Sequence, residues 1–78
     1  MPSSTDVAIR GDMIRLGQFL KLAGVADGGG EAKALVAQDA VSVNGEPEAR
    51  RGRQLHVGDI VEVGEGRWQV TLSDTVMG

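Results

Sequence analysis

The chain has 78 residues, a formal net charge of −3 and no cysteine. Its length allows one small domain, because domains of about 60 residues bury only about 60% of their unfolded surface and have little stability to spare. Without cysteine there is no disulfide framework, thiolate metal site or cysteine nucleophile. The sequence has no apolar run of about 18 residues and no signal-peptide pattern, so we expect a cytoplasmic protein that does not cross a membrane.

The N-terminal part is expected to contain one edge strand and one helix. Residues 7–10 are compatible with an edge strand, and Gly11 and Asp12 then read as a turn before the helix. The helix is predicted by apolar residues at positions i, i+3, i+4 and i+7, which are Leu16, Phe19, Leu20 and Ala23. Gly24 is placed to end it in the left-handed conformation, and the basic residues Arg15 and Lys21 would project from its other faces.

A second short helix is predicted after a glycine-rich turn at residues 27–30. Its apolar residues again have helical spacing and are Ala32, Leu35, Val36 and Ala40. Lys33 lies off this apolar stripe, so we expect its ammonium group to be exposed.

The C-terminal half has the features of short strands. Residues 41–43 alternate, and Asn44-Gly45 is a strong signal for a tight hairpin. Pro47 restricts the returning segment to an edge or an irregular course. Residues 55–63 supply further strands, interrupted by a turn at Gly58-Asp59, and residues 68–72 alternate as a last strand before an expected loose tail.

Charge is unevenly placed along the chain. Between Arg15 and Arg53 there are six basic and five acidic residues, whereas the remainder has two basic and six acidic residues. The acidic surplus therefore lies in the flanks, and the central segment is the part of the chain that suits a polyanion.

Several motifs in this order carry a family resemblance. Arg15-Leu16, the helix ending at Gly24-Val25, residues 31–36, residues 41–45 and Gly58-Asp59 resemble the S4-like RNA-binding domain over most of the chain. The chain is most similar to the small stand-alone bacterial members, often called YbcJ-like. The resemblance implies an α+β fold with two short helices packed on a small, mostly antiparallel curved sheet (the alpha-L motif), forming one domain over residues 1–78. Its core would span about 13–72, with flexible ends at 1–6 and 73–78.

Three positions depart from the family pattern. Gly17 stands where the family often has Asp, and Gly28-Gly29 stand where Ser-Arg often opens the second helix. Asp39 replaces the usual Gly before the strand at 41–43, so it must tolerate a helix-ending conformation that glycine accepts more easily.

The candidate RNA-binding residues are cations and glycines of the two helices and the basic loop. Guanidinium forks suit phosphate oxygens, and glycines before a helix would let backbone amides approach a phosphate. The set is Arg15, Lys21, Gly29, Gly30, Lys33, Arg50, Arg51 and Arg53. The alternative for the loop is a solvated segment in which Glu46 and Glu48 partly neutralise the arginines, and the three glycines can equally be a flexible turn.

Other residues give no catalytic or metal-binding pattern. Phe19 belongs to an apolar helix face and is expected in the core, while Trp68 either packs under the sheet or stacks on a base. His56 is the sole histidine and is expected to face outward from a strand without a second ligand. We therefore expect no enzyme, no metal and no cofactor.

Two kinds of function remain from the sequence. The first is non-catalytic binding of structured RNA, such as ribosomal or transfer RNA or a ribosome assembly intermediate, by a monomer that has no membrane partner. The second is a protein-protein interaction module or a ubiquitin-like small-sheet domain. The chain ends Val76-Met77-Gly78, so that second fold would lack a reactive Gly-Gly tail.

Overall fold

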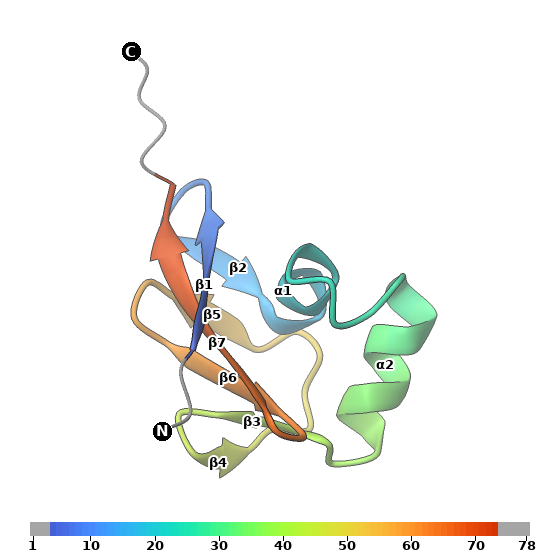
Figure 1. Ribbon diagram of the computed structural model, residues 1–78. Coiled ribbons are helices and arrows are strands. Elements are labelled where there is room, and N and C mark those ends of the chain that lie inside the picture. The colour runs from blue at the N-terminus through green and yellow to red at the C-terminus, as the bar shows by residue number, and fades with distance from the viewer. Residues whose placement is uncertain (1–3, 74–78) are drawn as a thin grey trace.

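A computed structural model describes residues 4–73 of the protein. Within this range the elements follow one another as β1 (Thr5–Ile9), β2 (Met13–Arg15), α1 (Leu16–Leu22), α2 (Gly29–Ala37), β3 (Val41–Val43), β4 (Glu46–Pro47), β5 (Gln54–His56), β6 (Ile60–Val63) and β7 (Gly66–Leu72). Figure 1 shows the two helices together on one side of the strands, with α1 next to β2.

The strands form two sheets of unequal size. The larger has five strands in the order β1-β7-β6-β3-β4, and the smaller is a ribbon of β2 and β5. Only β1 and β7 pair in parallel, while every other pairing is antiparallel. The expected α+β fold with a mostly antiparallel sheet is confirmed, and β4, which contains Pro47, lies at a sheet edge as its missing N–H group requires.

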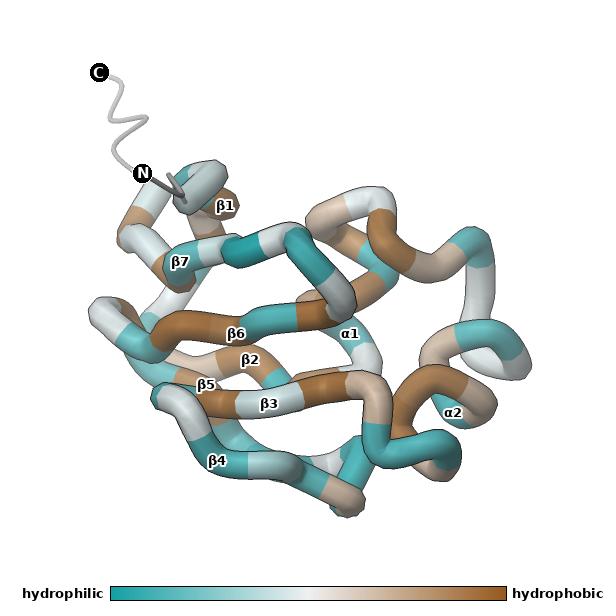
Figure 2. The backbone as a smooth tube through the Cα atoms, turned by 60° about the horizontal axis from the view of Figure 1, so that its bottom comes forward, coloured by the Kyte–Doolittle hydropathy of each residue, from teal (hydrophilic) through white to brown (hydrophobic). Residues whose placement is uncertain are grey.

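The core fills the space between the helices and the strands. Figure 2 shows a polar residue between apolar ones in both β3 and β6, as in a half-buried strand. The buried apolar residues of the described chain are Ile9, Leu16, Phe19, Leu20, Ala26, Ala32, Val36, Val41, Val43, Leu55, Val61 and Val70. Phe19 is fully buried, as predicted, and Trp68 is partly buried and packs against this core.

Both helices end in the same hydrogen-bonded motif. After α1, the N–H of Gly24 donates to the Lys21 carbonyl and that of Val25 to the Leu20 carbonyl, and Gly24 has φ of 79°. After α2, Asp39 has φ of 58°, so the expected helix-ending conformation at this position is confirmed. These are Schellman motifs, in which a left-handed residue lets two amides satisfy carbonyls of the last turn.

The helix starts differ from the prediction. Arg15 was expected on the first helix but is the last residue of β2 and the N-cap of α1, because it pairs with Gln54 across the ribbon. The turn at Gly11-Asp12 therefore leads into a strand. Gly29 and Gly30 were expected in the turn but form the first residues of α2. Ala40, expected on its apolar face, lies beyond its end.

Two turns of the chain are tied together by side chains. Asn44 donates from Nδ2 to Asp59 Oδ1 at 3.2 Å and accepts at Oδ1 from the N–H of Ile60 at 2.9 Å. Asp59 Oδ2 accepts from the N–H of His56 at 2.8 Å. The Asn-Gly and Gly-Asp signals of the sequence thus fix the ends of β3, β5 and β6 relative to one another.

The N-terminal strand extends the domain beyond the expected core. Thr5 and Asp6 belong to β1, although we expected them in a flexible end, and Ile9 is buried although it precedes residue 13. The N–H of Ser73 donates to the Ile9 carbonyl at 2.7 Å. The rest of the predicted loose tail, residues 74–78, lies outside the described residues.

Candidate nucleic-acid interface

The basic loop, residues 50–53, is anchored on the first turn of α1. The N–H of Leu16 donates to the Arg53 carbonyl at 2.8 Å and that of Gly17 to the Arg51 carbonyl at 2.9 Å. The first amides of a helix have no partner within it, and α1 has no side-chain cap, so the loop acts as the cap. Arg15 also donates from a guanidinium N–H to the Gly52 carbonyl at 3.1 Å. The position of the loop is therefore set by the helix it caps.

Gly17 allows this close approach. A β-carbon at Gly17 would lie 2.6 Å from Cγ of Arg51, closer than real atoms of this kind come. The departure from the family's Asp at Gly17 therefore has a structural reason, because only glycine leaves room for the aliphatic part of Arg51 against α1.

A hollow of about 300 Å³, here called the helix hollow, lies between the loop and the two helices. It is lined by Arg15, Gly17, Gln18, Lys21, Gly29, Ala32, Arg51 and Gly52. Four of the eight predicted site residues meet here. Within the described residues, Arg15, Lys21 and Arg51 have no acidic partner, so their charges are available to an anion.

The other two loop arginines are paired with a buried carboxylate. Glu48 Oε2 accepts from Arg50 Nε at 3.1 Å and from the Arg50 backbone at 3.0 Å, and Oε1 accepts from Arg53 at 2.6 Å. The Glu48 side chain is 7% exposed. The hydrogen bonds from Arg50 and Arg53 lower the pKa of Glu48 to about 2, against the opposing effect of burial, and the same contact raises the pKa of Arg50.

The alternative reading of the loop is thus correct for two of its arginines. Glu48 partly neutralises Arg50 and Arg53, whereas Glu46, exposed on β4, forms no ion pair within the described residues. Arg50 keeps an exposed side chain, so its remaining N–H donors face solvent.

The remaining predicted residues lie on the exposed start of α2. Gly30 and Lys33 are exposed but line neither hollow that the loop helps to form. At the same helix start, Glu31 accepts a hydrogen bond from the N–H of Asp27. A carboxylate therefore stabilises the α2 start where we expected only backbone amides.

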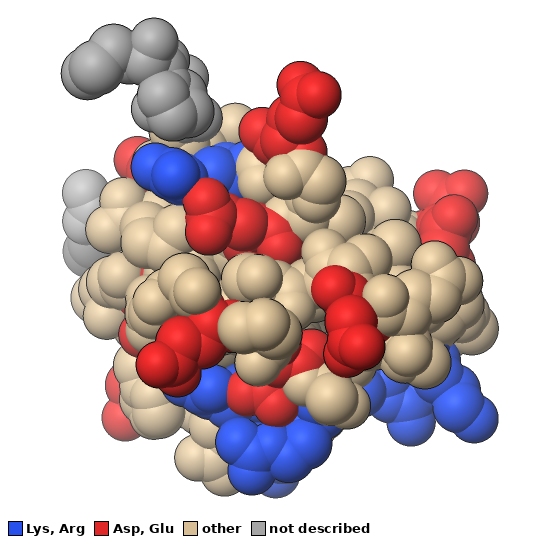
Figure 3. Space-filling view, turned by 90° about the horizontal axis from the view of Figure 1, so that it is seen from below, with Lys and Arg blue, Asp and Glu red and all other residues tan. Residues whose placement is uncertain are grey.

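The surface charge is distributed unevenly. In Figure 3 most of the basic side chains gather along the lower edge of the view, apart from one basic group at the upper left, and acidic side chains spread over the rest of that face. Of the two basic residues away from the loop and helices, Arg67 is paired with Glu62 at 2.9 Å, and Arg10 has no ion pair within the described residues. The unpaired positive charge is thus concentrated near the loop and the helices.

The family of the chain follows from sequence comparison. Residues 7–71 match the S4 domain. The chain belongs to the S4 domain family. The probable ribosome maturation protein RlbA of Bacillus subtilis is 54% identical over 65 residues, which cover 82% of this chain and 92% of that protein. The S4 resemblance that the sequence motifs carried, including the likeness to small stand-alone members, is confirmed.

Structural comparison agrees with this assignment. The 30S ribosomal protein S4e from Thermoplasma acidophilum superposes with a TM-score of 0.59 over 76% of this chain, at 19% identity. At this identity the likeness shows the fold alone. The matched part is 31% of the S4e chain.

The described residues contain neither a membrane-spanning helix nor a metal-binding cluster. Neither helix is long or apolar enough to cross a membrane. No cluster of three or more His, Cys, Asp or Glu side chains in residues 4–73 is arranged to hold a metal ion.

Some interface residues were not predicted from the sequence. Gln18 and Gly52 line the helix hollow, and Gly17 and Glu48 determine how the loop sits. A signal for Gly52 was present in the Arg-Arg-Gly-Arg run. Glu48 was named only in the alternative for the loop, as a partial neutraliser, and residue spacing in a loop does not indicate that it is buried.

Proposed function

We propose that this S4 domain binds structured RNA without catalysis, through the helix hollow. Support comes from membership in the S4 family, from a relative whose name assigns it to ribosome maturation, and above all from the meeting of Arg15, Lys21 and Arg51 around one hollow. Ribosomal RNA or a ribosome assembly intermediate, bound by a monomer, is the partner that these observations favour.

The chemistry of the hollow suits the RNA backbone. Folded RNA presents closely spaced phosphates, so a protein that reads its shape needs several cations on one rigid face. The aliphatic part of Arg51 lies against Gly17, and the Arg15 guanidinium donates to the Gly52 carbonyl, so two of the three cations have contacts within the protein before RNA arrives. This arrangement reduces the entropy lost when the side chains dock.

The other predicted residues have supporting roles in this proposal. Gly29 lines the hollow and has open space where a side chain would be, so a phosphate can approach the backbone there. Gly30 and Lys33, on the same helix, extend the face outward. Arg50 and Arg53 contribute their remaining N–H donors at reduced net charge, because Glu48 binds both.

The test is fluorescence anisotropy with structured ribosomal RNA fragments and matched unstructured oligonucleotides across a salt series. If about four cations contact phosphates, log affinity should fall against log salt with a slope of about −3 to −4. Arg51→Ala should lower affinity about five-fold at 0.1 M salt, the effect of about 1 kcal/mol, and reduce the slope by about 1.

Arg10→Ala is the matched control. Arg10 is exposed between β1 and β2 and lines neither hollow, so its loss changes net charge equally without touching the interface. Equal effects of the two substitutions would mean that only overall charge matters. Absence of binding at low salt would reject RNA as the partner and favour an acidic protein surface.

A further inference from the structure

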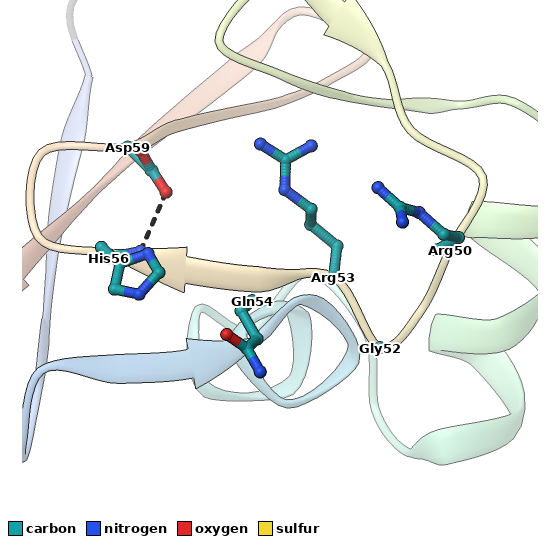
Figure 4. A pocket seen from close by; sticks show the side chains of 6 residues that line it. All are labelled: Arg50, Gly52, Arg53, Gln54, His56 and Asp59. Carbon is teal, nitrogen blue, oxygen red and sulfur yellow. Dashed lines mark hydrogen bonds between the residues drawn. The ribbon is translucent and has the colours of Figure 1, made fainter.

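A second hollow lies beside the first, on the β2–β5 ribbon, and is here called the ribbon hollow. Its volume is about 710 Å³, and it is lined by Arg50, Gly52, Arg53, Gln54, His56 and Asp59. Gly52 lines both hollows, so they are neighbours that share the basic loop. Figure 4 shows the Arg50 and Arg53 side chains near the loop, with His56 and Asp59 at the other end of β5.

The ribbon provides a continuous outward face between the two hollows. Gln54 lies opposite Arg15, and His56 lies opposite Met13. Residues directly opposite in an antiparallel pair have side chains on the same face, and Leu55, between them, is fully buried on the other face. The outward face of the ribbon therefore runs from Arg15, which lines the helix hollow, to His56.

The ribbon hollow differs from the helix hollow in its charge. Its two arginines, Arg50 and Arg53, are bound to Glu48. The carboxylate of Asp59 is occupied by the Asn44 amide and the His56 backbone. Two guanidinium groups are thus balanced by two carboxylates, and the excess positive charge that would attract phosphate is missing.

Two hydrogen-bonding side chains remain unused in this hollow. The Gln54 amide and the His56 imidazole are exposed and have no side-chain hydrogen bond within the described residues. An amide offers both donors and acceptors, and a neutral imidazole offers one of each. A ribose 2′-hydroxyl has the same mixed character, since it both donates and accepts, and DNA lacks it.

The backbone that carries these side chains is fixed. The N–H of Asp59 donates to the His56 carbonyl at 2.9 Å, and the N–H of Gly58 donates to the Val70 carbonyl at 2.8 Å. Together with the bond from the His56 amide to Asp59, these contacts hold the turn after β5 against β7. Little backbone ordering is then needed when a ligand binds.

We infer that the ribbon hollow binds the ribose 2′-hydroxyls of the nucleotides next to those whose phosphates enter the helix hollow, through Gln54 and His56. This inference rests on the proposed function. The helix hollow then supplies salt-dependent affinity, and the ribbon hollow distinguishes RNA from DNA. Phosphate contacts in the helix hollow would position the RNA, and contacts to its 2′-hydroxyls in the ribbon hollow would select RNA over DNA.

The experiment compares an RNA hairpin with the DNA hairpin of the same sequence, by anisotropy over a salt series, for the full chain. The Gln54→Ala/His56→Ala double variant should lose about ten-fold in RNA affinity, stay within about two-fold of the natural chain on DNA, and keep its salt slope. Gln38→Ala, an exposed glutamine at the end of α2, is the matched control and should change neither affinity.

The outcomes separate this inference from the proposed function. Salt-dependent RNA binding by the natural chain, with the double variant unchanged on RNA, would overturn the ribbon inference alone. A double variant that weakens RNA and DNA equally, or that lowers the salt slope, would overturn it as well, because that is the behaviour of a phosphate contact. No RNA binding by the natural chain would remove both. Thermal melting of each variant shows that it is folded, as the exposure of both side chains leads us to expect.

Discussion

Glu48 is a buried carboxylate among the loop arginines. It neutralises part of the charge of the arginines that it pairs with, so only an arginine that it does not contact keeps its full positive charge for a polyanion. It engages Arg50 and Arg53 and leaves Arg51 unpaired over Gly17. Removing one partner of a buried pair leaves the other uncompensated, so such a residue affects stability more than an exposed ion pair does.

Glu48→Gln should lower the free energy of unfolding at pH 7 by about 1–2 kcal/mol. We expect less than the loss for a fully buried ion pair, because the Arg50 side chain is 75% exposed and solvent screens its charge. The pKa of Glu48 in the folded state, about 2, lies below its usual 4.5. Its contribution is therefore present above pH 4.5 and is lost as the pH falls toward 2. Urea denaturation at pH 7 and pH 3 measures both effects.

The control for Glu48 is Glu46→Gln, which removes an exposed carboxylate without an ion pair in the described chain. The difference between the natural chain and Glu48→Gln should shrink at pH 3. A difference that is the same at both pH values would show that the carboxylate charge is not what stabilises the loop.

At this scale the sequence identifies the charged residues and offers Glu46 and Glu48 as partial neutralisers of the loop, but it does not indicate which carboxylate pairs with which arginine. Arg50, Arg51 and Arg53 stand out as a cluster, yet their different roles depend on contacts with Glu48 and Gly17. The Gly17 contact joins residues far apart in the sequence, and local patterns contain no information on which side of the loop meets α1.

Among the elements, those with local signals were predicted best. Gly24 and Asp39 mark both helix ends because Schellman motifs depend on adjacent residues. β2 was missed because it is three residues long and becomes a strand only by pairing with β5, which is distant in the sequence. The early start of α2 was also missed, since Glu31 reaches back to the Asp27 amide and favours a helix over two glycines.

The link between the two tight turns is the clearest test at the level of elements. Asp59→Ala removes the acceptors of the Asn44 amide and the His56 backbone, and we expect a loss of about 1–2 kcal/mol in the free energy of unfolding. Asp12→Ala, at an exposed acidic residue without a hydrogen bond in the described chain, is the control. Equal urea midpoints for the two variants would mean that the turns hold together without Asp59.

For the whole molecule, the N-terminal strand forms one edge of the larger sheet. β1 covers one edge of β7 through a parallel register from Thr5–Trp68 to Ile9–Leu72, and Ile9 is only 3% exposed. The sequence indicated an edge strand here but not its partner. β1 and β7 lie far apart in the sequence, and no local pattern marks their parallel pairing. Without β1, the seven-residue β7 would itself become an exposed edge.

A chain shortened to begin at Gly11 should therefore lose stability and self-associate. Removal of the buried Ile9 side chain alone should lower the free energy of unfolding by about 2–5 kcal/mol. Small domains have a total free energy of unfolding of only about 5–15 kcal/mol, so this is a large share of it. Urea denaturation gives the loss, and size-exclusion chromatography at several concentrations shows association through the exposed edge. A chain shortened to begin at Ser4 keeps all of β1 and is the matched control. If the chain beginning at Gly11 unfolds at the same urea concentration as that control and stays monomeric, β1 is not part of the stable domain, and the fold is complete from β2 onward.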